Sequence, residues 1–522
     1  MRRRASVGQT LVVILLTAAL SVGVFTLSRP QIVVGDPLPR LATYRYRPKP
    51  QPPKAQGQVA ADKPVTVDLG PTPAPVSVAS PDDPVALSLG ISLQQALEAA
   101  GDTGQTGIYV MDADGTVLYD RSGTVPLIPA STSKIVTAAM VLATFGPDHV
   151  FTTRVAATTP PDATGVVAGN LVLIGGGDPS LVSQTYIDAQ TDPERPQTPI
   201  SALADQIAAA GITTVEGSVV GDPAFLRGQT LADGWPPRYL EDLDATPISG
   251  LTIDQGLEFY DDDGRIRARA AADPSLQAAA ALTQALIDRG ITVAGQPQSL
   301  LEQETVMAMT PVAAVDSPSV MTLLTRVVQR SDNHMADTLF RAAGRHAVGT
   351  GSFTDAAGLA QELLAALQLD WSTTALADGS GLSRSSTIPP ALLTTLNYRM
   401  TNSAVGTQWQ DLMAIAGVSG TLERRLVGSI AELRLRGKTG SLADVRALTG
   451  AVVGPDGRPL YFTVISNDLS GEQLGRARRL QDLVVLALAA QLYGCTEVPP
   501  PPPEQPLLPD ELPPLPTHSC SI

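Results

Sequence analysis

Apolar and polar positions follow a helical period near both ends of one long region of this chain. Residues 91–100 have the spacing of a helix that Gly101 closes, and residues 472–493 predict a long final helix. Short apolar runs bounded by turn residues predict strands at residues 106–111, 116–119, 434–440, 445–453 and 460–466. The simplest arrangement is an α+β fold, in which one antiparallel sheet is built from both sequence ends and helices pack on it.

The middle of the chain has a different texture. From residue 153 to about residue 301 it is rich in glycine and in short β-type runs, with one helical stretch at residues 276–289. Gly175-Gly176-Gly177 is interpreted as a turn, because no Gly-Lys-Ser or Gly-Lys-Thr follows to make a phosphate loop. Helical periodicity returns at residues 320–330 and 334–344. The pattern therefore predicts a β-rich domain inserted into the α+β domain.

Both termini have the composition of segments outside the fold. Arg2-Arg3-Arg4 precedes an apolar run at residues 11–27 without a clean cleavage site, which favours a signal anchor over a cleaved signal peptide. Either alternative places the body outside the cytoplasm, anchored in the cell membrane or secreted. Proline-rich composition predicts an extended linker before the body and a tail after it. Cys495 and Cys520 lie in that tail, where a disulfide is favoured.

These patterns divide the chain into consecutive segments. In order they are a signal anchor or signal peptide (1–29), a proline-rich linker (30–86), the first part of the α+β domain (87–152), the inserted domain (153–305), the second part of the α+β domain (306–494) and a proline-rich tail (495–522).

Charge and histidine content narrow the function. The net charge is −15 and no basic patch is present, so a nucleic-acid partner is not expected. The four histidines show no spacing typical of metal ligands. We therefore expect no metal and no other cofactor.

Lysine usage singles out two positions. The chain has five lysines, and from residue 90 onward only Lys134 and Lys438 remain. Ser131 precedes Lys134 by three residues, so the two share one face of the first turn of a helix, where a lysine can act as base to a serine. The alternative is a helix-capping serine followed by a surface lysine.

Three motifs follow one another along the chain: Ser131-Thr132-Ser133-Lys134, Ser331-Asp332-Asn333 and Lys438-Thr439-Gly440. Each could arise by chance, but S-x-x-K, S-D-N and K-T-G in this order are the catalytic set of penicillin-binding proteins and class A β-lactamases. A further stretch is Asp378-Gly379-Ser380-Gly381-Leu382-Ser383-Arg384. With the long insertion between the first two motifs, the set resembles the D-alanyl-D-alanine carboxypeptidase/endopeptidase family, the low-molecular-mass class C penicillin-binding proteins. The resemblance covers about residues 91–493.

The resemblance implies a penicillin-recognising serine transpeptidase-like domain interrupted by the inserted domain. It implies a serine-type D-Ala-D-Ala carboxypeptidase, with endopeptidase activity as an addition, that acts on peptidoglycan stem peptides and is inhibited by β-lactams. Ser131 would be the acylated nucleophile and Lys134 its base. Ser331 would pass a proton to the leaving D-alanine, and Asn333 would hold Lys134 and the substrate amide.

The resemblance also implies residues that bind the substrate. Lys438 and Thr439 would bind its terminal carboxylate. The backbone N–H groups of Ser131 and Ser441 would form the oxyanion hole. Arg384 would lie near the cleft.

Two other functions stay open at this point. A β-lactamase would share the motifs, although no clear glutamate is placed to speed deacylation. A non-catalytic peptidoglycan-binding scaffold on the same fold would have no need for both Lys134 and Lys438.

Overall fold

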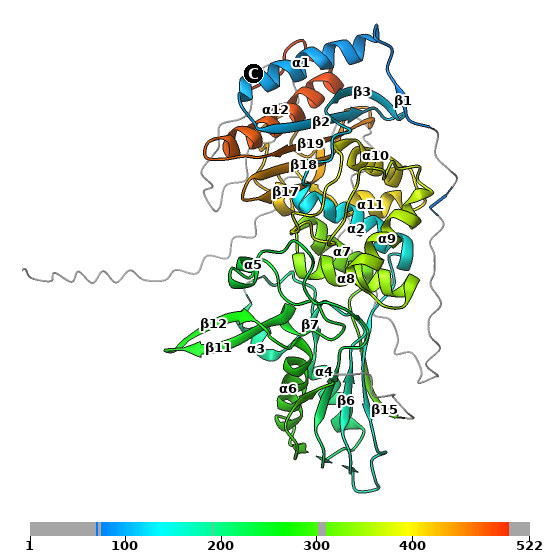
Figure 1. Cartoon of the computed structure of the whole chain (residues 1–522), viewed down its shortest axis with the longest axis vertical. Coiled ribbons are helices and arrows are strands. Elements are labelled where there is room, and N and C mark those ends of the chain that lie inside the picture. The colour runs from blue at the N-terminus through cyan, green and yellow to red at the C-terminus, as the bar shows by residue number, and fades with distance from the viewer. Residues whose placement is uncertain (1–68, 71–74, 191, 301–308, 501–522) are drawn as a thin grey trace, which may run out of the picture. The chain divides into compact units, whose positions relative to one another are not determined.

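The computed structural model describes residues 69–70, 75–190, 192–300 and 309–500 (Figure 1). The predicted signal segment, most of the predicted linker and most of the predicted tail lie outside these residues. Among the helices in these ranges, none is both long and apolar enough to cross a membrane. Cys495 is disulfide-bonded, as the cysteine count favoured, whereas Cys520 lies outside the described residues.

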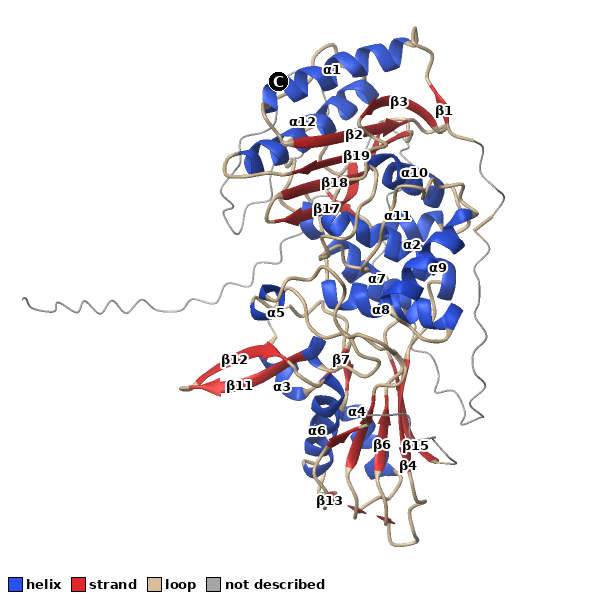
Figure 2. Cartoon of the chain, viewed as in Figure 1, coloured by secondary structure: helices blue, strands red, loops and turns tan. Residues whose placement is uncertain are grey.

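A seven-stranded sheet forms the centre of the α+β domain, in the order β1-β3-β2-β19-β18-β17-β16 (Figure 2). Its strands are β1 (Ser77–Val78), β2 (Gln105–Met111), β3 (Thr116–Arg121), β16 (Ala414–Ile415), β17 (Leu435–Leu442), β18 (Val445–Val453) and β19 (Pro459–Asn467). β1 runs parallel to β3, and every other neighbouring pair is antiparallel. Because β2 pairs with β19, the sheet joins the two sequence ends of the domain, as the hydrophobic pattern predicted.

Helices cover both faces of this sheet (Figure 1). They are α1 (Pro84–Ala100), α2 (Lys134–Phe145), α7 (Val320–Gln329), α8 (Asn333–Val348), α9 (Phe353–Ala365), α10 (Pro390–Thr401), α11 (Gly406–Leu412) and α12 (Gln473–Tyr493), with the 3-10 turns η1 (Ala130–Ser133) and η3 (Gly420–Leu422). α1 and α12 pack together over one face, and α10 packs on the other. α2 packs against α7, α8 and α9 and is buried along its whole length, because it is apolar on nearly all sides.

The burial of both faces is visible along β2. Ile108 and Val110 belong to the core under α1 and α12. Tyr109 and Met111, which point the other way, pack with Tyr398 of α10. A strand buried on both sides is apolar at successive positions, which explains why this part of the sequence is a continuous apolar run.

The inserted domain has sheets and a core of its own. Its elements are β4 (Thr152–Ala157), β5 (Val166–Val167), β6 (Leu171–Ile174), β7 (Leu181–Val182), α3 (Gln184–Ala189), β8 (Thr198–Pro199), α4 (Ser201–Ala209), β9 (Thr214–Val215), β10 (Val219–Asp222), α5 (Arg238–Glu241), η2 (Asp254–Gly256), β11 (Leu257–Asp262), β12 (Arg265–Ala270), α6 (Pro274–Ile287), β13 (Thr292–Val293), β14 (Gln298–Ser299) and β15 (Thr310–Asp316). The largest sheet has the order β14-β10-β6-β4-β15, and α4 and α6 pack against it around a separate apolar core. β4 carries the chain into this domain, β15 carries it out, and the two pair antiparallel.

The predicted α+β architecture with an insertion is confirmed, although helices and strands extend beyond two of the predicted segment boundaries. β1 and the first turn of α1 lie within the range predicted as linker. Pro84 occupies the first position of α1 directly after Asp83, whose carboxylate accepts hydrogen bonds from the backbone N–H groups of Val85 and Ala86. Proline suits this position because its missing N–H would have no partner there. At the other limit, β15 lies beyond residue 305 and belongs to the inserted sheet.

Candidate active site

Ser131 lies in η1, the tight turn that leads directly into α2. Ala130 before it has a left-handed backbone with φ of 47°, which is uncommon for a residue with a side chain. Gly440 of β17 comes very close to this turn. A Cβ atom there would lie 2.8 Å from the Pro129 carbonyl oxygen and 3.1 Å from the Ser131 backbone nitrogen. Only a residue without a side chain lets β17 approach the serine this closely.

Lys134 is the first residue of α2 and is fully buried. Its Nζ lies 3.0 Å from Ser131 Oγ, 2.8 Å from Asn333 Oδ1 and 2.7 Å from the Ser380 carbonyl oxygen. Burial lowers the pKa of Lys134 below its ordinary value, and nearby carboxylates, Asp337 foremost, oppose this shift. A lysine in this setting can take a proton from the serine without strongly basic conditions.

Two buried carboxyl groups, those of Asp337 and Asp378, lie near Lys134. Asp337 Oδ1 accepts hydrogen bonds from the backbone N–H groups of Gly379 and Ser380, at 2.8 and 2.9 Å, and so holds the backbone directly before the Ser380 carbonyl that binds Lys134. Asp337 Oδ2 has no hydrogen-bond partner among the described residues. Burial and the charge of Asp378 raise the pKa of the Asp337 carboxyl above its ordinary value.

The Ser331-Asp332-Asn333 motif joins α7 to α8. Ser331 has a left-handed backbone with φ of 61°, and the Asp332 carboxylate caps α8 by accepting a hydrogen bond from the Met335 backbone N–H at 3.0 Å. The guanidinium of Arg195, from the inserted domain, lies 2.5 Å from the Asp332 carboxylate, and both side chains are more than nine-tenths buried. Burial alone would raise the pKa of Asp332, but Arg195 and the cap hold it below its ordinary value.

Lys438 lies on β17 and is also fully buried. Its Nζ donates hydrogen bonds to Ser331 Oγ at 2.9 Å and to the Thr439 carbonyl oxygen at 2.8 Å. Burial, reinforced by the charge of Lys134, holds the pKa of Lys438 well below its ordinary value. Lys134 contacts Asn333 and Lys438 contacts Ser331, so the structure brings the three sequence motifs together around two buried lysines.

These motifs border a cleft of about 350 Å³. Ser131, Ser331, Asn333 and Ser441 line it from the α+β domain. The inserted domain supplies the lining residues Arg238, Tyr239, Asp242 and Asp244. Asn333 Nδ2 donates a hydrogen bond to the Asp244 carbonyl oxygen at 2.9 Å, which fixes the orientation of the Asn333 amide. The inserted domain thus forms one wall of the cleft that holds Ser131.

Two of the predicted substrate-binding side chains have protein partners beside this cleft. Arg384 forms a two-pronged ion pair with the Asp444 carboxylate, with N···O distances of 3.0 and 2.5 Å. The hydrogen bonds to Asp444 raise the pKa of Arg384 above its ordinary value. Thr439 Oγ1 donates a hydrogen bond to Thr421 Oγ1 at 2.7 Å. Neither side chain is among the residues that line the cleft, and their roles in binding substrate stay predictions.

Two residues around the site were missed from the sequence. Asp337 follows Asn333 by four residues, so helical spacing on α8 could have pointed to it. Arg195 precedes Asp332 by 137 residues, and no local pattern connects the two. Among the described residues, no group of three or more His, Cys, Asp or Glu side chains is arranged to hold a metal ion.

Comparison with known proteins gives the family. The sequence model of the D-Ala-D-Ala carboxypeptidase 3 (S13) family matches residues 89–262 and 261–489. This chain belongs to the S13 family. Carboxypeptidase DacB of Mycolicibacterium smegmatis, a relative of this S13 chain, is 33% identical over 454 residues, which cover 84% of this chain and 91% of the relative. The D-alanyl-D-alanine carboxypeptidase of an Actinomadura strain is 28% identical over 455 residues, covering 74% and 81%.

Solved structures agree on the fold. Penicillin binding protein 4 (dacB) of Haemophilus influenzae matches with a TM-score of 0.64 at 20% identity, over 74% of this chain and 97% of that chain. The resemblance drawn from the motifs and the predicted penicillin-binding-protein fold are therefore confirmed. The chain is an enzyme of a serine-type D-Ala-D-Ala carboxypeptidase family.

Proposed function

We propose that this S13 carboxypeptidase works through an acyl-enzyme on Ser131, acts on peptidoglycan stem peptides that end in D-Ala-D-Ala, and is inhibited by β-lactams. The observation that carries the proposal is the 3.0 Å contact between Lys134 Nζ and Ser131 Oγ, with Lys134 fully buried. A second structure of the Haemophilus influenzae protein, matched with a TM-score of 0.59, contains a β-lactam. That relative supports the choice of β-lactams as inhibitors.

The contacts of Lys134 suit a neutral amine. A neutral amine has two N–H donors and one lone pair. The two donors match the two acceptors, Asn333 Oδ1 and the Ser380 carbonyl oxygen, and the lone pair is left for the Ser131 hydroxyl proton. Burial favours this uncharged form. Lys134 is then ready to take the proton when Ser131 attacks.

The chemical steps follow from this arrangement. Ser131 Oγ attacks the carbonyl carbon of the penultimate D-alanine, and its proton moves to Lys134. The backbone N–H groups of Ser131 and Ser441 stabilise the oxyanion. The amide C–N bond breaks as Ser331 passes a proton to the leaving D-alanine, and Lys438, which contacts Ser331 Oγ, can replace that proton. Water then hydrolyses the ester and frees the serine.

Because Lys438 is buried, its contribution to substrate binding differs from the direct contact with the terminal carboxylate that the resemblance implied. Its ammonium group lies behind Ser331, which lines the cleft, and Lys438 does not line the cleft itself. A neutral Lys134 removes the repulsion that disfavours a protonated Lys438, so we infer that Lys438 carries the charge of the pair and attracts the terminal carboxylate of the substrate in a poorly screened setting. Direct hydrogen bonds to that carboxylate would come from Thr439 and Ser441.

The first test is intact-mass analysis of the protein after incubation with penicillin. We expect one adduct on the wild type and none on Ser131→Ala. The chain offers a matched control in Ser133→Ala, because Ser133 lies in the same turn, is buried, and its hydroxyl has no hydrogen-bond partner in the described structure. That variant should still be acylated.

Other outcomes separate the remaining functions. An adduct that persists on Ser131→Ala would refute the assignment of the nucleophile. No adduct together with intact penicillin would favour a non-catalytic scaffold, whereas no adduct together with hydrolysed penicillin would favour a β-lactamase. Release of D-alanine from a pentapeptide, compared with cleavage of a cross-linked dimer, measures carboxypeptidase against endopeptidase activity.

We also propose that residues 1–29 export the body and anchor it in the cell membrane. The support is the run of arginines before an apolar stretch of 17 residues, at positions 11–27. Cell fractionation of the full chain tests this proposal, with a chain that lacks residues 1–29 as the control. Recovery of the full chain in the cytoplasm would refute it.

A further inference from the structure

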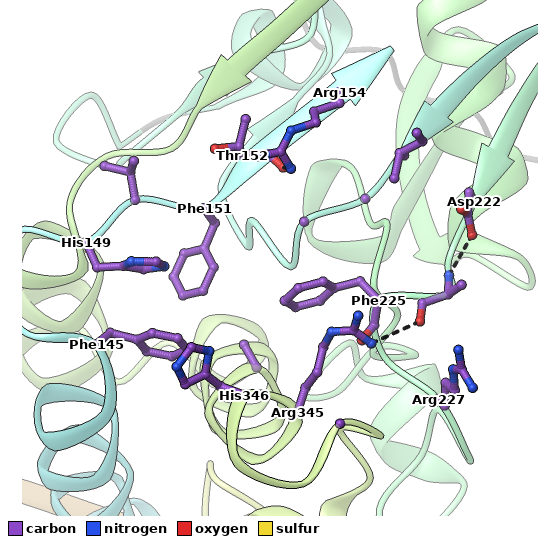
Figure 3. Close-up of a pocket in the computed structure, with 17 residues that line it drawn as sticks. Phe145, His149, Phe151, Thr152, Arg154, Asp222, Phe225, Arg227, Arg345 and His346 are labelled. Carbon is purple, nitrogen blue, oxygen red and sulfur yellow. Dashed lines mark hydrogen bonds between the residues drawn. The ribbon is translucent and has the colours of Figure 1, made fainter. Parts of the chain in front are cut away.

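A second cavity, of about 580 Å³, lies where the inserted domain meets the α+β domain (Figure 3). Its walls come from the end of α2, the start of β4, the ends of β6 and β10, and the last turns of α8. It shares no lining residue with the cleft around Ser131. α2 has Lys134 at its first residue and Phe145, which lines this cavity, at its last, so the two sites are roughly 17 Å apart along this helix. We call this second site the junction cavity.

One side of the junction cavity is cationic. Arg227 and Arg345 lie on this side and Arg154 lines the opposite edge (Figure 3), and within the described part of the chain none of the three forms an ion pair. Arg345 Nη1 donates to the Phe225 carbonyl oxygen at 2.8 Å, and Arg154 Nη1 to a carbonyl at 3.4 Å. The acidic residue in the lining is Asp222, whose Oδ1 already accepts a hydrogen bond from a backbone N–H. This local excess of positive charge stands in a chain of net charge −15.

Arg345 is unfavourably placed without a counter-charge. Burial lowers the pKa of Arg345 below its ordinary value, the charge of Arg227 lowers it further, and Asp222 opposes these effects only in part. The Arg345 guanidinium also lies 4.6 Å from the Phe225 ring centre, in a cation–π contact. An anion between Arg227 and Arg345 would offset both the burial and the repulsion.

The other side of the cavity is aromatic. Phe145 stacks on His149 with 4.6 Å between ring centres, Phe151 meets Phe145 edge-on at 5.3 Å, and His346 lies 5.1 Å from Phe145. In Figure 3 these four rings gather on one side of the cavity, and Arg227 and Arg345 lie across from them. A wall of rings favours a ligand with an apolar or ring-shaped body.

Two glycines of the Gly175-Gly176-Gly177 run also lie at the junction cavity. Gly175 and Gly176, at the end of β6, line the cavity. A Cβ atom on Gly176 would lie 2.1 Å from the Thr152 carbonyl oxygen, so side chains are excluded by close packing. β6 and β10 run parallel, and their carboxyl ends meet at this cavity. Crevices at the carboxyl ends of parallel strands are common ligand sites.

We propose that the junction cavity binds a small ligand in which a phosphate or carboxylate group, held by Arg227 and Arg345, is attached to a ring or apolar body that packs on Phe145 and Phe151. Phosphate esters and carboxylic acids share this chemistry. The volume of about 580 Å³ suits a ligand of this size. The proposal does not depend on the role of Ser131.

The test is isothermal titration calorimetry on the purified protein with matched probes. Phenyl phosphate and benzoate each combine a ring with an anion, inorganic phosphate lacks the ring, and phenol lacks the charge. We expect saturable binding of phenyl phosphate, of benzoate, or of both, and weaker binding of inorganic phosphate and phenol. Whichever anionic probe binds more tightly identifies the kind of anion that the site prefers.

Variants show where the probe binds. Arg227→Gln changes an exposed side chain and should weaken binding about tenfold, with a larger loss when Arg345→Gln is added. Arg265→Gln removes the same charge from an exposed position on β12 and should leave binding unchanged. Absence of saturable binding of both anionic probes, equal binding of phenol, or an equal loss in Arg265→Gln would overturn the proposal.

Discussion

The close approach of Gly440 to the serine turn gives a quantitative prediction. In Gly440→Ala, the new Cβ would lie 2.8 Å from the Pro129 carbonyl oxygen, about 0.5 Å closer than an ordinary carbon–oxygen contact of ~3.3 Å. Both partners are backbone, so the clash cannot be relieved by rotating a side chain. β17 must move away from η1, and the backbone N–H groups of Ser131 and Ser441, which we propose as the oxyanion hole, must separate by a similar amount.

A shift of this size should lower the rate of acylation by penicillin roughly tenfold to a hundredfold, or about 1.5–3 kcal/mol in transition-state stabilisation. Stopped-flow or quenched-flow acylation measures this rate, and thermal unfolding checks that the fold persists. Gly90→Ala is the control, because a Cβ on this residue of α1 would meet no atom within 4 Å. An unchanged acylation rate in a folded Gly440→Ala protein would contradict the proposed oxyanion hole.

Three further predictions concern buried carboxyl groups. Asp337→Ala removes the carboxyl oxygen that holds the Gly379 and Ser380 N–H groups next to the Ser380 carbonyl, so Lys134 should lose a fixed partner and acylation by penicillin should slow about tenfold; an unchanged rate in a folded variant would show that Asp337 does not position the base. Arg195→Gln leaves buried Asp332 with only its longer ion pair to Arg326, at 3.6 Å, and should lower the free energy of unfolding by about 1.5–3 kcal/mol, as measured by urea denaturation. Burial raises the pKa of Asp254 to about 6. The folded state therefore binds a proton that the unfolded state releases between roughly pH 4 and 6, and stability from this group is lost as the pH rises. The stability of the wild type relative to Asp254→Asn should fall by about 2.4 kcal/mol from pH 4 to pH 7, and a pH-independent difference would show that the group titrates normally.

The sequence analysis was most accurate for elements that are surrounded by apolar neighbours on all sides. β18 has its predicted bounds because it lies between β17 and β19 with both faces covered, so that apolar residues continue until the Gly454 turn. The sequence does not reveal the start of α1, because Asp83 and Pro84 continue the composition of the proline-rich linker. Their value as helix cap and first helical residue depends on the turn that follows them.

In the candidate site, too, some contacts could be predicted from the sequence and others could not. Ser131 and Lys134 could be paired from their spacing, because one helical turn fixes the distance between them. The contact between Arg195 and Asp332 could not, since it depends on how the inserted domain packs on α7 and α8. The partner of Arg384 was also hidden: Asp444 lies 60 residues away, and only the position of β17 and β18 brings it to the arginine.

The pairing of β2 with β19 has a consequence for how the protein folds. Thr106 and Ser466, which share a hydrogen bond across these strands, are 360 residues apart in sequence. The chain must therefore be complete almost to α12 before the central sheet can close, and pairing across such a long loop is slow. The inserted domain is continuous and can form its own core earlier. Loss of the last strand and helix would leave β2 as an exposed edge prone to aggregation, so a truncated chain would be removed by quality control and would not persist as a weak enzyme.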